Sequence, residues 1–69
     1  MGDAMTQETD ALAQIRAAVL ALRAAAGHLG ALTSGEIAAL GRAEGAATET
    51  HDMIARRLGA APLPPPDGV

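Results

Sequence analysis

The chain of 69 residues contains no cysteine, phenylalanine, tryptophan, tyrosine or lysine. Without cysteine it can form no disulfide and no thiolate metal site, which suits a reducing compartment, and we expect a cytoplasmic location. Without aromatic side chains, any core must be built from aliphatic residues alone. The net charge is −3, and Arg56-Arg57 is the only pair of adjacent cations. Nucleic-acid binding needs clustered positive charge, so we expect no nucleic-acid partner.

Long apolar runs are also missing. The longest uncharged stretch of the expected helical region, residues 24–35, has 12 residues and contains three glycines. A membrane-spanning helix needs about 20 predominantly apolar residues. Residues 1–6 carry no basic segment ahead of an apolar one, so no signal peptide is visible. We therefore expect a soluble protein with no membrane partner.

Alanine, by contrast, accounts for 18 of the 69 residues, which makes helix the default conformation. After a polar lead-in (1–9), large apolar residues recur at steps of three and four, the spacing of a helix that packs along another. These seam residues are Leu12, Ile15, Val19 and Leu22. We expect Thr6 or Thr9 to cap this first helix.

A glycine-containing stretch, residues 27–33, predicts a break before a second helix. Thr33 and Glu36 have the spacing of a capping box, in which each side chain accepts a hydrogen bond from the other residue's backbone. The second helix should therefore start at Ser34. It should end at Leu58, with Gly59 as its C-cap. Its apolar seam residues are Ile37, Leu40 and Ile54.

These features predict an all-α fold, an antiparallel helical hairpin over residues 10–59, because a connection of about six residues favours antiparallel neighbours. Residues 60–69 hold four prolines and should form an extended, non-helical tail that either is disordered or lies along a surface. The tail could present a proline-rich ligand through Pro62–Pro66 or a carboxyl-terminal motif through Asp67–Val69, or it could be a plain tail.

Polar residues interrupt the seam of the second helix. If the chain reverses at residues 30–31, Glu44 faces Arg16 and His51 faces Asp10. Such pairs would fix the register of the helices. Glu44 and His51 are candidates for a structural, a pH-sensing or a metal-binding role. We predict no cofactor.

Each helix carries further apolar residues beside its seam, which one hairpin cannot cover. The candidate partner-binding residues are Leu20, Gly41, Gly45, Ala46 and Met53. Covering them would make the hairpin half of a four-helix bundle, formed by dimerisation or with a partner. We therefore predict a small protein-binding helical module, namely an adaptor, a chaperone-like protein or an assembly subunit, acting in a homodimer or hetero-oligomer by helix packing.

Two other functions fit the sequence less well than protein binding. A DNA-associated helix-turn-helix protein or small transcription regulator would also contain two helices, but a third helix and a basic recognition surface are missing. A metal-binding bundle subunit would use Glu44 and His51, but the Glu-x-x-His spacing of di-iron bundles is absent. Two helices cannot enclose a substrate pocket, so we expect no enzymatic activity.

The segment Leu32–Leu40 reads Leu-Thr-Ser-Gly-Glu-Ile-Ala-Ala-Leu. At the level of protein class it resembles helix-hairpin chaperones and adaptors, such as those of bacterial flagellar or secretion export. This resemblance covers nine residues and implies a protein-binding role.

Overall fold

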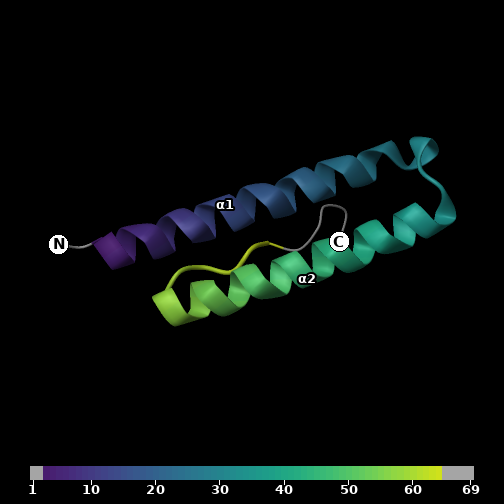
Figure 1. Cartoon of the computed structure of the whole chain (residues 1–69). Helices are drawn as coiled ribbons and strands as arrows, with labels where there is room; N and C mark the ends of the chain where they lie inside the picture. Colours follow the sequence, from purple (N-terminus) through teal and green to yellow (C-terminus); the bar gives the residue numbers. More distant parts are fainter. Residues whose placement is uncertain (1–2, 65–69) are drawn as a thin grey trace.

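A computed structural model of the chain describes residues 3–64. Two long helices lie antiparallel and side by side (Figure 1). Helix α1 spans Asp3–Ala25, and helix α2 spans Ser34–Leu58. A short 3-10 helix, η1 (Ala26–Ala31), follows α1 directly. The predicted all-α helical hairpin is therefore confirmed.

Helix α1 begins earlier than the sequence predicted. Residues 3–9 of the expected lead-in are helical, so the predicted N-caps at Thr6 and Thr9 are wrong. Residues 3–9 contain no glycine or proline to stop a helix, and Gln and Glu have good helix propensity. Glu8 also forms an ion pair with Arg57 of α2, which ties this segment to the second helix.

Helix α2 has the predicted boundaries. The Thr33 Oγ1 atom accepts a hydrogen bond from the Glu36 backbone N–H at 3.2 Å, and Glu36 Oε1 accepts one from the Thr33 N–H at 2.8 Å. Together they form the predicted capping box. At the other end, Gly59 has the left-handed φ of 75°, and its N–H points to the carbonyls of Ala55 and Arg56. Glycine adopts this conformation without a steric cost.

The chain reverses later than predicted. The 3-10 helix η1 extends the first arm to Ala31, and the turn falls at Leu32 and Thr33. The cross-helix ion pairs Glu8–Arg57 and Arg23–Glu44 have their midpoints between residues 32 and 34. Each residue of α1 therefore faces a position several residues further along α2 than a reversal at 30–31 would give.

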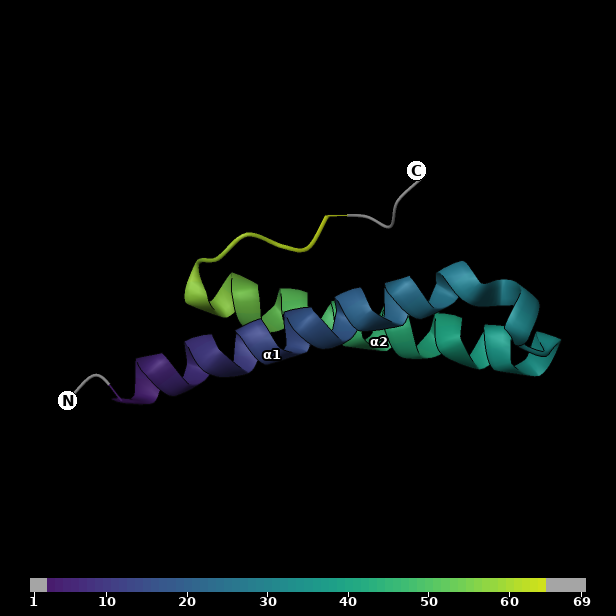
Figure 2. The same ribbon diagram turned by 90° about the horizontal axis from the view of Figure 1, so that it is seen from above.

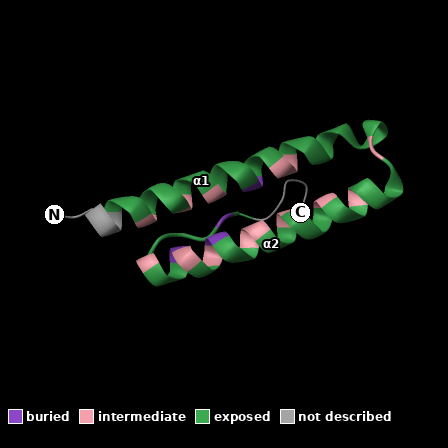
Figure 3. Cartoon of the chain, in the orientation of Figure 1, coloured by how far each residue is buried: buried purple, intermediate pink, exposed green. Residues whose placement is uncertain are grey.

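The helices meet along the predicted seam. Val19 is fully buried, and the other six seam residues are half-buried (Figure 3). These six are Leu12, Ile15, Leu22, Ile37, Leu40 and Ile54. The Cα atoms span 48 × 21 × 14 Å, and the two helices form a single layer. No helix among residues 3–64 is long and apolar enough to cross a membrane.

After Gly59 the chain turns back and runs over one side of the hairpin (Figures 1 and 2). Residues 60–64 have no regular secondary structure, as the prolines predicted. They contact both helices, because Leu63 is hydrogen-bonded to Asp52 of α2 and Pro64 to Arg23 of α1. We call residues 60–64 the return segment.

Candidate functional site

The return segment is anchored at Leu63, whose side chain is 8% exposed. The Leu63 backbone N–H donates a hydrogen bond to Asp52 Oδ1 at 3.0 Å. Pro62 and Pro64 have no backbone N–H, so Leu63 supplies the single main-chain donor of this tripeptide. Asp52 therefore accepts the one backbone N–H that residues 62–64 offer.

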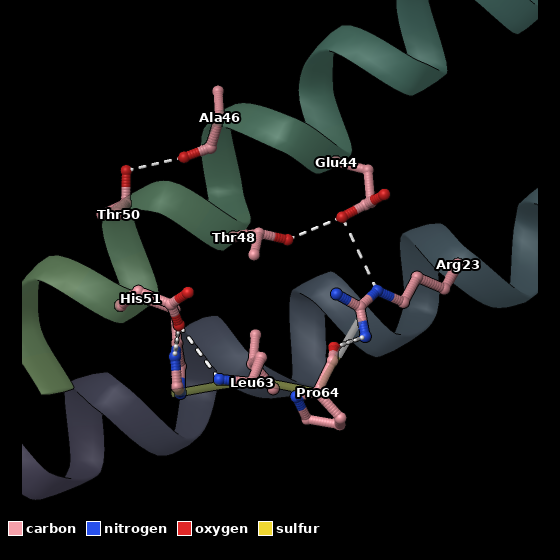
Figure 4. Close-up of polar contacts among 9 residues, drawn as sticks. Arg23, Glu44, Ala46, Thr48, Thr50, His51, Leu63 and Pro64 are labelled. Atoms are coloured by element: carbon pink, nitrogen blue, oxygen red, sulfur yellow. Dashed lines mark hydrogen bonds and ion pairs between the residues drawn. The ribbon is translucent and has the colours of Figure 1, made fainter. Parts of the chain in front are cut away.

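The second anchor is Arg23, at the C-terminal end of α1. Its Nη1 donates a hydrogen bond to the Pro64 carbonyl oxygen at 2.8 Å (Figure 4). Its Nε lies 3.6 Å from Glu44 Oε2, and the Thr48 hydroxyl donates to that same oxygen at 2.6 Å. The Nε atom is buried and makes no hydrogen bond. Glu44 thus holds the guanidinium by charge, while Nη1 remains directed at the return segment.

His51 contacts Asp52, the residue that binds the Leu63 N–H. It is 3% exposed, and its Nδ1 lies 3.0 Å from Asp52 Oδ1. Because an ionised carboxylate only accepts hydrogen bonds, this contact requires the ring form that carries hydrogen on Nδ1. Two donors therefore converge on one carboxylate oxygen. The hydrogen bond from Leu63, followed by that from His51, lowers the pKa of Asp52 below its ordinary value.

Both predicted polar pairs are wrong. Glu44 pairs with Arg23 and not with Arg16, and His51 pairs with Asp52 and not with Asp10. Arg16 and Asp10 are both exposed. For Glu44 the cause is the later reversal of the chain, because it places Arg23, which lies further along α1 than Arg16, opposite Glu44. For His51, a neighbour on its own helix supplies the partner.

We call Asp52, Arg23 and the buried site of the Leu63 side chain the tail clamp. One polar group comes from each helix, and the clamp therefore exists only when the hairpin is closed. It contacts the main chain at two points and encloses a single side chain, since residues 60–62 and Pro64 are exposed. This is the arrangement by which proteins bind an extended peptide.

A cavity of about 450 Å³ continues from the tail clamp toward the turn of the hairpin. Arg23 and Glu44 line its near end, where the Pro64 carbonyl is held. Four large aliphatic residues line the rest, together with smaller ones. The aliphatic residues are Leu22, Leu29, Ile37 and Leu40. We call the tail clamp and this cavity together the return groove.

The five predicted interface residues are all exposed, but they do not form one surface. Leu20 lies on α1 and is 47% exposed. On α2, Ala46 and Met53 are seven residues apart and share one side, while Gly41 and Gly45, four apart, share another. A Cβ atom built on either glycine would meet nothing within 4 Å, so no backbone approaches them closely inside the hairpin. Gly41 lines the cavity instead.

Sequence reasoning missed the residues of the tail clamp. Leu63 is the only large aliphatic residue among the prolines of residues 62–66, and that isolation was the available signal. Ala55 is 1% exposed and was missed as well, although it lies four residues after His51 on the same side of α2. The Asp67–Val69 motif, and Pro65 and Pro66 of the proline-rich ligand, lie outside the described residues.

No group of three or more His, Cys, Asp or Glu side chains in the part of the chain that the structure describes could hold a metal ion. Comparison with known proteins gives no further guide to the chemistry. No protein-family model matches the chain, and neither a curated protein nor a solved structure matches it. The function must therefore be inferred from the surfaces of the hairpin itself.

Proposed function

We propose that this chain is a protein-binding helical module that acts by helix packing, with a second copy of the chain as its partner in a four-helix bundle. The proposal depends on a stripe along the outer side of α1 that carries no charge. The stripe consists of Ala13, Ala17, Leu20 and Ala24. All four residues are exposed, and their spacing places them on one side of the helix, turned about 100–160° away from Val19.

The small number of buried residues supports the proposal. Among the residues that the structure describes, only Val19, His51, Ala55 and Leu63 are buried. Domains of this size gain stability from a metal, a disulfide or association, and the chain has no cysteine for a disulfide. Packing the outer stripe against a second copy would bury Leu20 and add a second core.

The small side chains of the stripe suit close helix packing. Helices in bundles cross at about 20° with their axes 8–10 Å apart, and the smaller separations need small residues at the contact. Alanine occupies three of the four stripe positions, and Leu20 supplies one large apolar side chain near the centre. A second helix can therefore lie along α1 and enclose Leu20.

The charges of the hairpin favour a protein partner over a nucleic acid. Two of its five arginines, Arg23 and Arg57, are already paired with the carboxylates of Glu44 and Glu8. Paired cations release few counterions on binding a phosphate backbone. The uncharged outer stripe of α1 suits the adaptor, chaperone-like and assembly-subunit roles. The DNA-binding role would need clustered positive charge instead.

Light scattering on the full chain and its Leu20→Glu variant tests the proposal. Wild type should be dimeric at micromolar concentration, and Leu20→Glu should be monomeric, because a charge cannot be buried in the packed stripe. Gln14→Glu is the matched control, since it adds the same charge to α1 outside the stripe and should leave the dimer intact. A wild-type chain that is fully helical and monomeric would overturn the proposal.

A further inference from the structure

We propose that the return groove is a receptor for an extended segment of another protein, with the pattern Pro-Leu-Pro followed two or three residues later by a large aliphatic residue. The chain's own return segment occupies only the first half of this groove. The inference goes beyond the bundle proposed above and does not depend on it, because the groove and the outer stripe of α1 have no residue in common.

The tail clamp defines the first half of the ligand. Asp52 accepts the one main-chain N–H, Arg23 donates to the next carbonyl oxygen, and the leucine side chain is buried between these contacts. Prolines on both sides of the leucine are favoured because they remove N–H groups that would otherwise lose water without gaining a partner. They also hold the segment extended before it binds, which reduces the entropy cost of binding.

The cavity beyond Arg23 defines the second half. Its aliphatic lining extends along α1 from Leu22 to Leu29, which is about 10 Å of helix. An extended chain advances about 3 Å per residue, so two to three residues beyond Pro64 reach from the middle of the cavity to its far part. Leu29 is 49% exposed, and an aliphatic side chain entering there would cover it.

The chain's own sequence supplies an incomplete ligand. Pro64 is followed by Pro65, Pro66, Asp67 and Gly68, so the positions two to four residues on offer no large aliphatic side chain. A second copy of the chain has the same sequence and would fit the cavity no better. These considerations favour a different protein as the source of the ligand.

The return segment then acts as a weak internal competitor. The Ala60 N–H donates to the Ala55 carbonyl at the end of α2, and beyond Ala60 two hydrogen bonds and one buried side chain hold the described part of the segment. A ligand that adds contacts in the cavity can therefore displace residues 61–64. Binding should release Leu63 from Asp52 while leaving both helices in place. The amide signal of Leu63 therefore reports on displacement directly.

The test uses the ¹⁵N-labelled full chain and a blocked peptide, Ala-Pro-Leu-Pro-Ala-Ala-Leu-Ala. The peptide should shift the Leu63 amide signal of wild type toward its position in an Asp52→Ala variant, which keeps Leu63 but has lost the acceptor of its N–H. In a Leu63→Asp variant the return segment cannot dock. Leu63→Asp should bind the peptide at least about tenfold more tightly than wild type, because it has lost the internal competitor. Adding Asp52→Ala to that variant should abolish binding.

A second peptide in which the last leucine is replaced by alanine tests the cavity, and its affinity should be about tenfold lower. Equal affinity for the two peptides would overturn the two-part ligand. Leu63→Ala, a milder change, replaces Leu63→Asp if circular dichroism shows that the latter has lost its helices. Absence of both displacement from wild type and binding to the helical variant would overturn the proposal. So would a Leu63 signal that depends on protein concentration alone, since a second copy would then fill the groove.

Discussion

The Oδ1 atom of Asp52 lies 3.0 Å from the backbone nitrogen of Leu63, eleven residues further along the chain. This contact joins the return segment to α2, just as the hydrogen bond between Arg23 and Pro64 joins it to α1. The segment therefore bridges the two helices. Docking of the segment and closure of the hairpin should stabilise one another, because the two anchoring groups come from different helices.

The pH dependence of docking follows from Asp52. Its pKa is lowered from the ordinary value of 3.8 by the hydrogen bonds from Leu63 and His51. A carboxyl group whose pKa is lower in the folded state contributes stability above its unfolded pKa, and that contribution is lost as pH falls through the folded pKa. The contribution of Asp52 to docking should therefore be fully present above about pH 5 and be lost progressively below about pH 4. Amide exchange at Leu63, corrected for its intrinsic pH dependence, measures this.

Asp52→Asn is the control for that titration. The amide retains an oxygen acceptor of the same shape but has no charge to lose in this range. Docking in this variant should be weaker than in wild type at neutral pH, and the difference should shrink as the wild-type carboxylate becomes protonated. A wild type and variant that weaken in parallel would show that another group governs the acid transition.

The capping box makes a prediction about α2. Thr33→Ala removes the hydroxyl that accepts from the Glu36 N–H, so it should lower the free energy of unfolding by about 1 kcal/mol. Ser34→Ala is the matched control, because Ser34 is exposed and lies one residue inside the helix. Urea denaturation followed by circular dichroism distinguishes the two. Equal losses for both variants would mean that the capping bond contributes nothing in solution.

Local signals in the sequence predicted most of the fold, and signals that depend on long-range contacts did not. The capping box at Thr33 and the glycine at residue 59 act within four residues of themselves, so their effect is visible in the sequence. In the first turns of α1, Glu8 pairs with Arg57, which is 49 residues away, and no local pattern indicates this contact. The register of the helices depends on a 3-10 helix after α1, and no residue pattern in 26–31 predicted one.

The tail clamp shows the same limit. Prolines predicted that the C-terminal tail would be extended, and residues 60–64 are indeed non-helical. Asp52 and Arg23 determine the path of the return segment. They are charged residues on separate helices, and the sequence alone gives no reason to distinguish them from other surface residues. Their common partner became visible only when the hairpin brought them to the same side. The outer stripe of α1, by contrast, was visible in the helical spacing of Leu20 and its alanine neighbours.

Two glycines should respond to alanine in opposite directions. Gly59 has φ of 75°, where a Cβ atom is strained, so Gly59→Ala should lower the free energy of unfolding by about 1–2 kcal/mol. Gly45 lies inside α2 with open space around its Cα, so Gly45→Ala should raise that free energy by about 0.5–1 kcal/mol. Thermal unfolding of the two variants provides the comparison. If Gly45→Ala destabilised the chain instead, a close backbone contact at Gly45 in the assembled protein would be indicated.

Val19 and Leu20 are neighbours with opposite environments, and their substitutions separate folding from association. Val19 is fully buried in the seam, whereas Leu20 is 47% exposed on the outer stripe. Val19→Ala removes two buried carbon atoms and leaves a space, so it should cost about 1.5–3 kcal/mol in the free energy of unfolding at any protein concentration.

Leu20→Ala leaves the seam intact, and its cost should be close to zero in dilute solution, where the chain is monomeric. At concentrations that favour the dimer, Leu20→Ala should become destabilising, because the wild type then gains stability from association and the variant gains less. Urea unfolding at two protein concentrations a hundredfold apart measures both effects. A cost for Leu20→Ala that does not change with concentration would place Leu20 in the fold of the single chain and remove it from the partner surface.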